Sequence, residues 1–161
     1  MDYQENNYIG DSNPAYEFYK IKKRSTLFFN TIICHICKLS PPKLKNALYR
    51  LIGVHIGENV LIAPYVQIDP FFPEMITLDD NVIIGWGASI FTHEFTTDKI
   101  RKGKVHIKKR ALVGGFSIVR SGVTIGKHAV IGIGSYVNRD IKDNESVGGN
   151  PLKKIMPRDL K

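Results

Sequence analysis

An aliphatic side chain recurs at every sixth position through much of the chain. The longest uninterrupted series comprises Ile107, Val113, Val119, Ile125, Ile131 and Val137. Two shorter series with the same step precede it, namely Ile56, Ile62 and Ile68, and then Leu78, Ile84 and Ile90. A period of six fits neither the 3.6-residue period of a helix nor the two-residue alternation of a strand. It predicts short strands separated by turns, which is the pattern of a parallel β-helix and therefore of an all-β solenoid.

A smaller or branched residue follows four positions after each aliphatic one, as at Val60, Val82 and Val123. Each hexad thus supplies two side chains to a common core. If three hexads form one triangular coil, the chain of 161 residues holds roughly four coils, which is one domain. A solenoid of this size leaves flat faces that can pack against copies of itself.

The chain carries 23 Lys and Arg against 15 Asp and Glu, a formal net charge of +8. A solvated basic surface, a phosphate-bearing ligand, an anionic membrane surface and nucleic acid are all compatible with this charge. No recognisable nucleic-acid motif accompanies it, so we expect no nucleic-acid partner. The low cysteine content and the lack of a recognisable signal peptide predict a cytoplasmic protein.

Cys34 and Cys37 form a single Cys-x-x-Cys pair within an apolar stretch. A metal or redox site of this kind needs a second pair or a βαβ context, and the sequence has neither. We therefore interpret both cysteines as core residues and expect no metal.

The periodicity divides the chain into segments. They are a flexible arm at residues 1–14, a helical segment at 15–53, a β-helix at 54–148 with an inserted polar loop at 94–106, and a tail at 149–161. The apolar run at residues 27–36 follows several basic residues and is too short to cross a bilayer. It is compatible with a helix packed on the solenoid and with a helix lying on an anionic membrane. Polar loops inserted into a rigid repeat often carry function.

The hexads, Thr92 and His93 at the start of the insertion, and the closing Gly149, Asn150, Pro151 and Lys153 together resemble the left-handed β-helix acyltransferases. The closest subgroups are the maltose and galactoside O-acetyltransferases and the acetyltransferases of polysaccharide gene clusters. Residues 45–57 resemble the segment that leads into the β-helix of the latter, and the whole resemblance covers about residues 42–154. It implies a left-handed parallel β-helix with N-terminal helices and a short C-terminal tail. It also implies a homotrimer with sites at subunit interfaces, which acetylates a small-molecule or glycan hydroxyl with acetyl-CoA.

His93 occupies the position at which members of this family carry their general base. An imidazole can take the proton of an acceptor hydroxyl near neutral pH. The other four histidines, His35, His55, His106 and His128, do not begin the insertion. A base is usually oriented by a second group, and Glu94 and Asp69 are the candidates. The sugar acetyltransferases of this family place an Asn on the preceding coil, whereas residues 63–69 contain none, so the acceptor contacts of the family are not carried over to this chain.

The resemblance also implies where coenzyme A binds. Its pantetheine arm would pass Gly115 and Ile133, and its phosphates would lie near basic or polar residues, namely Asn138, Arg139, Lys153 and Lys154. The last basic residue of the family pattern falls on Met156, for which Arg158 is the candidate substitute. Backbone N–H groups at Gly114 and Gly115 are candidates to bind the oxyanion of the thioester carbonyl.

Three other functions remain open on the sequence. The same base would serve N-acetyl transfer to an amino sugar. A γ-class carbonic anhydrase shares the β-helix but needs a close pair of zinc-binding histidines, and His93, His106 and His128 lack that spacing. A non-catalytic trimeric scaffold, held at a membrane by residues 20–36, would bind no acetyl-CoA.

Overall fold

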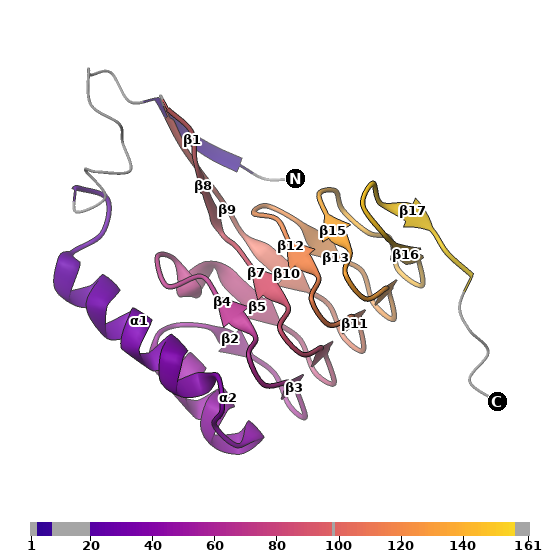
Figure 1. Ribbon diagram of the computed structural model, residues 1–161, viewed down its shortest axis with the longest axis horizontal. Coiled ribbons are helices and arrows are strands. Elements are labelled where there is room, and N and C mark those ends of the chain that lie inside the picture. The colour runs from indigo at the N-terminus through magenta and orange to yellow at the C-terminus, as the bar shows by residue number, and fades with distance from the viewer. Residues whose placement is uncertain (1–2, 8–19, 98, 157–161) are drawn as a thin grey trace.

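The computed structural model describes residues 3–7, 20–97 and 99–156. Its body consists of three parallel sheets of very short strands, and the chain passes from one sheet to the next (Figure 1). The first sheet contains β2 (His55–Ile56), β5 (Ile76–Leu78), β10 (Val105–Ile107) and β13 (Thr124–Ile125). The second contains β3 (Leu61–Ile62), β6 (Ile83–Ile84), β11 (Leu112–Val113), β14 (Val130–Ile131), β16 (Ser146–Gly148) and β17 (Lys153–Lys154). The third contains β4 (Gln67–Ile68), β7 (Ser89–Ile90), β12 (Ile118–Val119) and β15 (Tyr136–Val137).

The strand register follows the predicted hexads. Val113 pairs with Ile131, eighteen positions later, so one uninterrupted coil uses three hexads. The side chains of the aliphatic series point inward, and most of them are completely buried. Because each fills a slot between the coils above and below it, truncating one such isoleucine to alanine would cost about 2–5 kcal/mol of stability. The period of six therefore predicted the three-sided parallel stack correctly.

The turns between the first and second sheets bring the backbone into the left-handed region. Asn59, Asn81 and Asn144 occupy this position on three coils, with φ between 52° and 59°. Asparagine tolerates this conformation better than most residues. The coils also approach closely, since a Cβ on Gly85 would lie 2.4 Å from the backbone nitrogen of Gly115.

Two helices close the first coil, α1 (Arg24–Cys37) and α2 (Pro42–Leu51) (Figure 1). The carbonyls of this coil have no earlier coil to bond. Side chains of the helices bind them instead: Lys45 Nζ donates to the carbonyls of Ile62 and Ala63, at 3.1 and 3.0 Å, and Tyr49 Oη donates to that of Val66. Burial lowers the pKa of Lys45, while the nearby Cys37 opposes that shift. The helices thus cap an otherwise exposed edge of the stack.

The two cysteines belong to this cap, as predicted. Both are free and buried, and Cys34 Sγ donates a 3.6 Å hydrogen bond to the Ile68 carbonyl. Burial raises the pKa of Cys34 to about 12 and that of Cys37 to about 11. Thiols of this kind are neutral packing groups at neutral pH.

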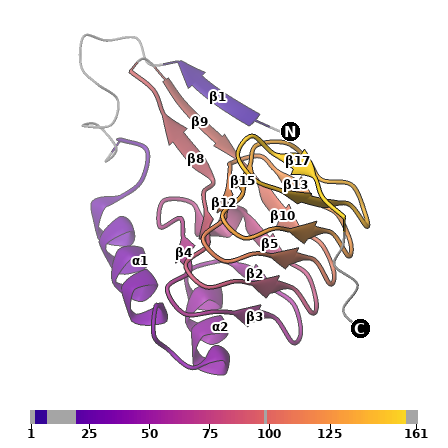
Figure 2. The same cartoon turned by 45° about the vertical axis from the view of Figure 1, so that its right-hand side comes forward.

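The insertion is more ordered than the predicted loop. β8 (His93–Phe95) and β9 (Lys99–Gly103) form an antiparallel hairpin that projects from the stack (Figure 2). β1 (Tyr3–Asn7), within the predicted flexible arm, adds a third antiparallel strand beside β9. Residues 8–14 of that arm, residues 15–19 of the expected helix and Arg158 lie outside the described residues. Because both segments are polar, the sequence did not predict this pairing of β1 with β9, which lie about one hundred residues apart.

Two further features complete the fold. A short 3-10 helix (Pro73–Met75) begins at the last residue of the interruption at residues 70–73, between the first and second coils. In the tail, β17 pairs antiparallel with β16 and covers the last strand of the second sheet. Among the helices in the described part of the chain, none has the length and apolarity required to span a bilayer.

Candidate active site

The site is built at the corner where the chain leaves the third sheet. Asp69 follows β4 directly, and its backbone N–H donates to the Ile90 carbonyl at the end of β7 on the next coil. Thr92 and His93 lie just beyond Ile90. The two interruptions of the hexad pattern, residues 70–73 and 94–106, begin at this same corner on successive coils. The distant residues Asp69 and His93 are therefore brought together by the stacking of coils.

His93 is bound to a buried carboxylate. Its Nδ1 lies 2.5 Å from Asp69 Oδ2, and Asp69 is 1% exposed. The same carboxylate accepts hydrogen bonds from the Thr92 N–H and hydroxyl, each at 2.8 Å, and from the Phe71 N–H at 2.9 Å. Four donors thus converge on one side chain, which fixes its position.

The ionisation of Asp69 follows from these contacts. Burial raises its pKa, but hydrogen bonds from His93, Thr92 and Phe71 and the attraction of His93 outweigh burial, so the pKa lies below its ordinary value. An ionised carboxylate only accepts hydrogen bonds. The proton in the 2.5 Å contact is therefore carried by His93 Nδ1, so that the lone pair of the neutral imidazole lies on Nε2.

Aromatic side chains surround the imidazole. The ring of Phe71 lies 4.4 Å from that of His93, the ring of Phe95 at 5.1 Å and that of Phe72 at 6.1 Å, between centroids. The His93 side chain is 14% exposed. Packing holds the ring in one orientation and limits water around it, while a small part of it stays accessible.

The sequence did not predict the aromatic shell around His93, to which Phe71 and Phe72 contribute from the interruption at residues 70–73. The number of hexads before each interruption could have predicted that the two interruptions lie close together. Both interruptions follow the third hexad of a coil, so they must meet at one corner.

Glu94, the other candidate for orienting His93, has different partners. Its carboxylate accepts two hydrogen bonds from Arg120, at 2.6 and 2.8 Å, and one from Ser121 Oγ at 2.8 Å. Hydrogen bonding from Arg120 lowers the pKa of Glu94 below its ordinary value, although partial burial opposes this. Neighbouring residues of a strand point to opposite faces. Glu94 thus ties the hairpin to the next coil, a role that the sequence did not reveal.

The other described histidines are placed differently. His106 Nε2 lies 2.9 Å from Asp79 Oδ1, but both side chains are more than a third exposed. His35 contacts the Thr31 carbonyl within α1, and His128 holds a left-handed turn position. Among the residues that the structure describes, no three His, Cys, Asp or Glu side chains gather as a metal-binding group.

Four of the six predicted coenzyme A residues fall at the two edges of the third sheet. Gly115 and Ile133 lie on adjacent coils at its entry corner, where the Gly134 N–H donates to the Gly115 carbonyl. Ile133 is 79% exposed. Asn138 and Arg139 follow β15 at the exit corner, two coils above His93.

Four residues named for coenzyme A binding have other partners or positions in the structure. Arg139 is paired with Glu145 at 2.9 Å, so its charge is partly neutralised. Lys153 and Lys154 are exposed but extend the second sheet rather than the third. The N–H of Gly114 donates to the Ile131 carbonyl within the sheet and is thereby removed as an oxyanion donor.

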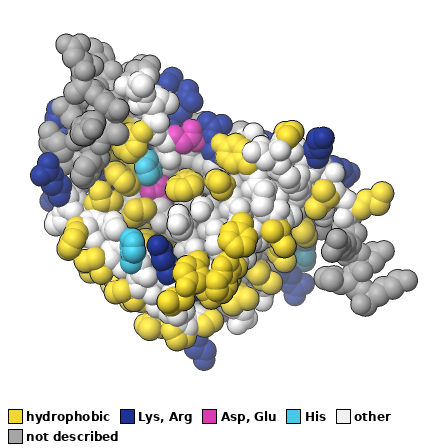
Figure 3. Space-filling view, in the orientation of Figure 1, with side chains coloured by type: hydrophobic (Ala, Val, Ile, Leu, Met, Phe, Trp, Pro, Cys, Tyr) yellow, Lys and Arg dark blue, Asp and Glu magenta, His cyan; other side chains and the backbone are white. Residues whose placement is uncertain are grey.

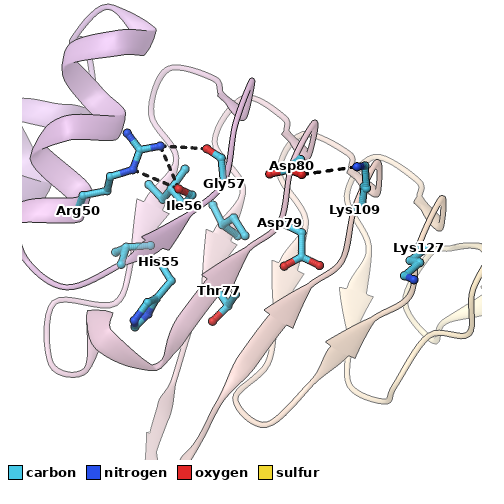
Figure 4. Close-up of a pocket in the computed structure, with 11 residues that line it drawn as sticks. Arg50, His55, Ile56, Gly57, Thr77, Asp79, Asp80, Lys109 and Lys127 are labelled. Atoms are coloured by element: carbon cyan, nitrogen blue, oxygen red, sulfur yellow. Dashed lines mark hydrogen bonds and ion pairs between the residues drawn. The ribbon is translucent and has the colours of Figure 1, made fainter.

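A separate cavity of about 590 Å³ opens beside the first sheet (Figure 4). Asp79, Asp80, Lys109 and Lys127 line it, and Arg50 reaches it from α2. Arg50 donates to the carbonyls of Ile56 and Gly57, and Lys109 Nζ lies 3.5 Å from Asp80 Oδ2. The lining charges are thus largely paired with their neighbours, and neither His93 nor any predicted coenzyme A contact borders the cavity.

Comparisons of sequence and of structure both relate the chain to acetyltransferases. Residues 104–139 match the family "Hexapeptide repeat of succinyl-transferase". The chain is 31% identical over 153 residues to "Putative acetyltransferase YvoF" of Bacillus subtilis, which covers 94% of this chain and 89% of the relative. The fold resembles the crystal structure of a maltose O-acetyltransferase from Clostridium difficile 630, with a TM-score of 0.66, 19% identity and coverage of 81% and 85% of the two chains. It also resembles the hexapeptide-repeat acetyltransferase VCA0836 of Vibrio cholerae complexed with acetyl-CoA, with a TM-score of 0.64, 18% identity and coverage of 86% and 90%.

Proposed function

Since the chain belongs to the hexapeptide-repeat acetyltransferases and is an acyltransferase enzyme, we propose that it transfers an acetyl group from acetyl-CoA to a hydroxyl of a sugar or polysaccharide precursor. His93 is the general base of this proposal, and Asp69 orients it. The enzyme is a cytoplasmic homotrimer of left-handed β-helices, with its sites at subunit interfaces. Residues 54–148 form the catalytic β-helix, to which residues 1–14, 15–53 and 149–161 are added.

One observation carries the assignment of the base. His93 is held through Nδ1 by the buried, ionised carboxylate of Asp69, which leaves Nε2 to receive a proton. A general base needs this combination of fixed orientation and a free lone pair. The more exposed contact of His106 with Asp79 lacks the burial and the additional donors.

The proposed reaction is direct transfer. His93 Nε2 takes the proton of the acceptor hydroxyl as its oxygen attacks the thioester carbonyl. A carbon–oxygen bond forms, and collapse of the tetrahedral intermediate breaks the carbon–sulfur bond. The departing thiolate receives the proton from His93, so that the base is restored. Asp69 stabilises the transient imidazolium by its negative charge.

The coenzyme A groove follows the outer face of the third sheet. Gly115 and Ile133 border one edge of that face, and Asn138 and Arg139 border the other. Exposed apolar side chains at its entry corner, Trp86, Phe116 and Ile133, would be covered by an adjacent subunit in the trimer. A groove closed by a second copy would shield the thioester from water.

Isothermal titration with acetyl-CoA and an acceptor assay test the proposal together. Wild-type protein should bind acetyl-CoA and release a free thiol when sugar acceptors are added. His93→Ala should retain binding and lose turnover. No acetyl-CoA binding in either protein would favour a non-catalytic scaffold, and acetylation of amino sugars alone would show N-transfer. Light scattering on the same samples measures whether a trimer forms.

A further inference from the structure

The net positive charge of this protein lies in one segment. Residues 18–57 contain eight Lys and Arg and no Asp or Glu. The other residues contain 15 of each sign, because the whole chain has 23 basic and 15 acidic residues. The net charge of +8 therefore belongs entirely to the segment that forms α1, α2 and their flanks.

Part of that charge has a structural use. Lys45 and Arg50 bind open carbonyls of the first coil, and Lys22 pairs with Glu74 at 2.8 Å. The five other cations of the segment lie at the two ends of α1. Lys20, Lys23 and Arg24 precede or begin the helix, and Lys38 and Lys43 follow it. All of these are exposed except Lys38, which is half-buried.

The outer face of α1 is apolar. Its inner face, which includes Asn30, Ile33, Cys34 and Cys37, is buried against the first coil. Large hydrophobic side chains nevertheless cover the outer face, namely Phe28 (69% exposed), Phe29, Ile32 and Ile36, and Leu39 (70% exposed) follows just beyond the end of the helix. At 100° per residue, the four helical positions fall within an arc of about 100°. Figure 3 shows hydrophobic side chains gathered where α1 and α2 lie in Figure 1.

This pattern matches a helix that lies in a membrane interface. Such helices bury an apolar face at the boundary of headgroups and acyl chains and place Lys and Arg at the level of the phosphates. α1 has 14 residues, and its inner face is fixed to the solenoid, so it can only lie flat on such a surface. Soluble monomers rarely expose so continuous an apolar patch without a partner.

The charge of the segment indicates what covers the outer face of α1. A second copy of the same helical surface would bring the same cations with no acidic residues to meet them. The rest of the chain carries no net charge to attract this segment. We propose that the outer face of α1 docks on an anionic lipid bilayer, so that the enzyme works while attached to the membrane surface.

Vesicle co-sedimentation tests the proposal with the full chain. Wild-type protein should sediment with vesicles of equal parts phosphatidylglycerol and phosphatidylcholine, and not with phosphatidylcholine alone. Added salt should release it, because interfacial attraction of this kind is screened. Equal binding to both vesicles, or no binding to either, would overturn the proposal.

Two pairs of charge reversals with the same net charge locate the surface. Lys23→Glu with Lys43→Glu should weaken binding to anionic vesicles by about tenfold or more. Lys104→Glu with Lys127→Glu, which alters exposed cations on the β-helix, should bind as wild type. The first pair adds acids at helix N-termini, where negative charge stabilises helices, so unfolding does not explain its effect. Equal losses in both pairs would show only a general dependence on charge.

A third variant tests the apolar face. Phe28→Ser with Ile32→Ser should abolish vesicle binding while acetyl-CoA binding and circular dichroism remain unchanged. Retained vesicle binding would contradict docking by α1. A change in assembly size by light scattering, without a change in vesicle binding, would show instead that α1 packs on a second copy of the chain.

Discussion

Two histidine–carboxylate pairs lie on neighbouring parts of the β-helix, and they differ in burial. His93 contacts Asp69 at 2.5 Å, and His106 contacts Asp79 at 2.9 Å. The side chain of Asp69 is inaccessible, while that of Asp79 is 34% exposed. Asp69 also holds three further hydrogen bonds, from Thr92 and Phe71. Water competes for the exposed carboxylate of Asp79, whereas the buried carboxylate of Asp69 holds His93 in a fixed orientation.

The largest effect should come from removing the proposed base, His93. His93→Ala should lower turnover by about 10²–10⁴-fold, the usual contribution of a positioned general base. His106→Ala should leave turnover nearly unchanged, because its ring lies outside the aromatic shell. A thiol-release assay on both variants measures the difference. Equal losses at both histidines would refute the distinction between the two pairs.

The next largest effect should come from the carboxylates. Asp69→Asn keeps the shape of the side chain but removes the charge and lets an amide N–H compete at His93 Nδ1. Turnover should fall by about 10²-fold or more, because the imidazole loses the partner that fixes its tautomer. Acetyl-CoA affinity, measured by titration calorimetry, should not change. Asp79→Asn is the matched control, and a similar loss there would contradict the role given to burial.

A smaller effect is expected at Glu94, which follows the proposed base His93 directly in the sequence. Its carboxylate is engaged by Arg120 and Ser121. Glu94→Gln should therefore weaken the attachment of the hairpin and lower turnover by less than about tenfold, since no proton transfer is lost. The pH profile of the remaining activity should keep the wild-type shape. A loss as large as that of His93→Ala would place Glu94 in the chemistry.

The smallest expected effect is on the pH dependence of stability. Because the pKa of Asp69 is lowered in the folded state, its contribution is present above the unfolded pKa of about 3.9 and is lost as the pH falls through the folded pKa. The wild-type free energy of unfolding should therefore decline more steeply with acid than that of Asp69→Asn. Urea unfolding at neutral and acidic pH measures both slopes, and parallel slopes would be inconsistent with the lowered pKa.

The sequence predicted the repeat and part of the candidate site. The hexad period predicted the three-sided stack, because each short strand repeats one local pattern of burial. The position of His93 at the start of the insertion marked it among five histidines. The apolar surroundings of Cys34 and Cys37 correctly predicted that both are core residues.

The repeating coils could be predicted from the sequence, because the period of six is a local pattern that records which residues of each hexad face the core. Tertiary structure alone decided between Asp69 and Glu94 as the partner of His93. Glu94 is adjacent in sequence, but strand alternation turns it toward Arg120. Asp69 lies 24 positions away and meets His93 only because one coil stacks on the next. The pairing of β1 with β9 in the hairpin also depends on tertiary structure. Pairing between segments that are distant in sequence leaves no periodic pattern in either of them.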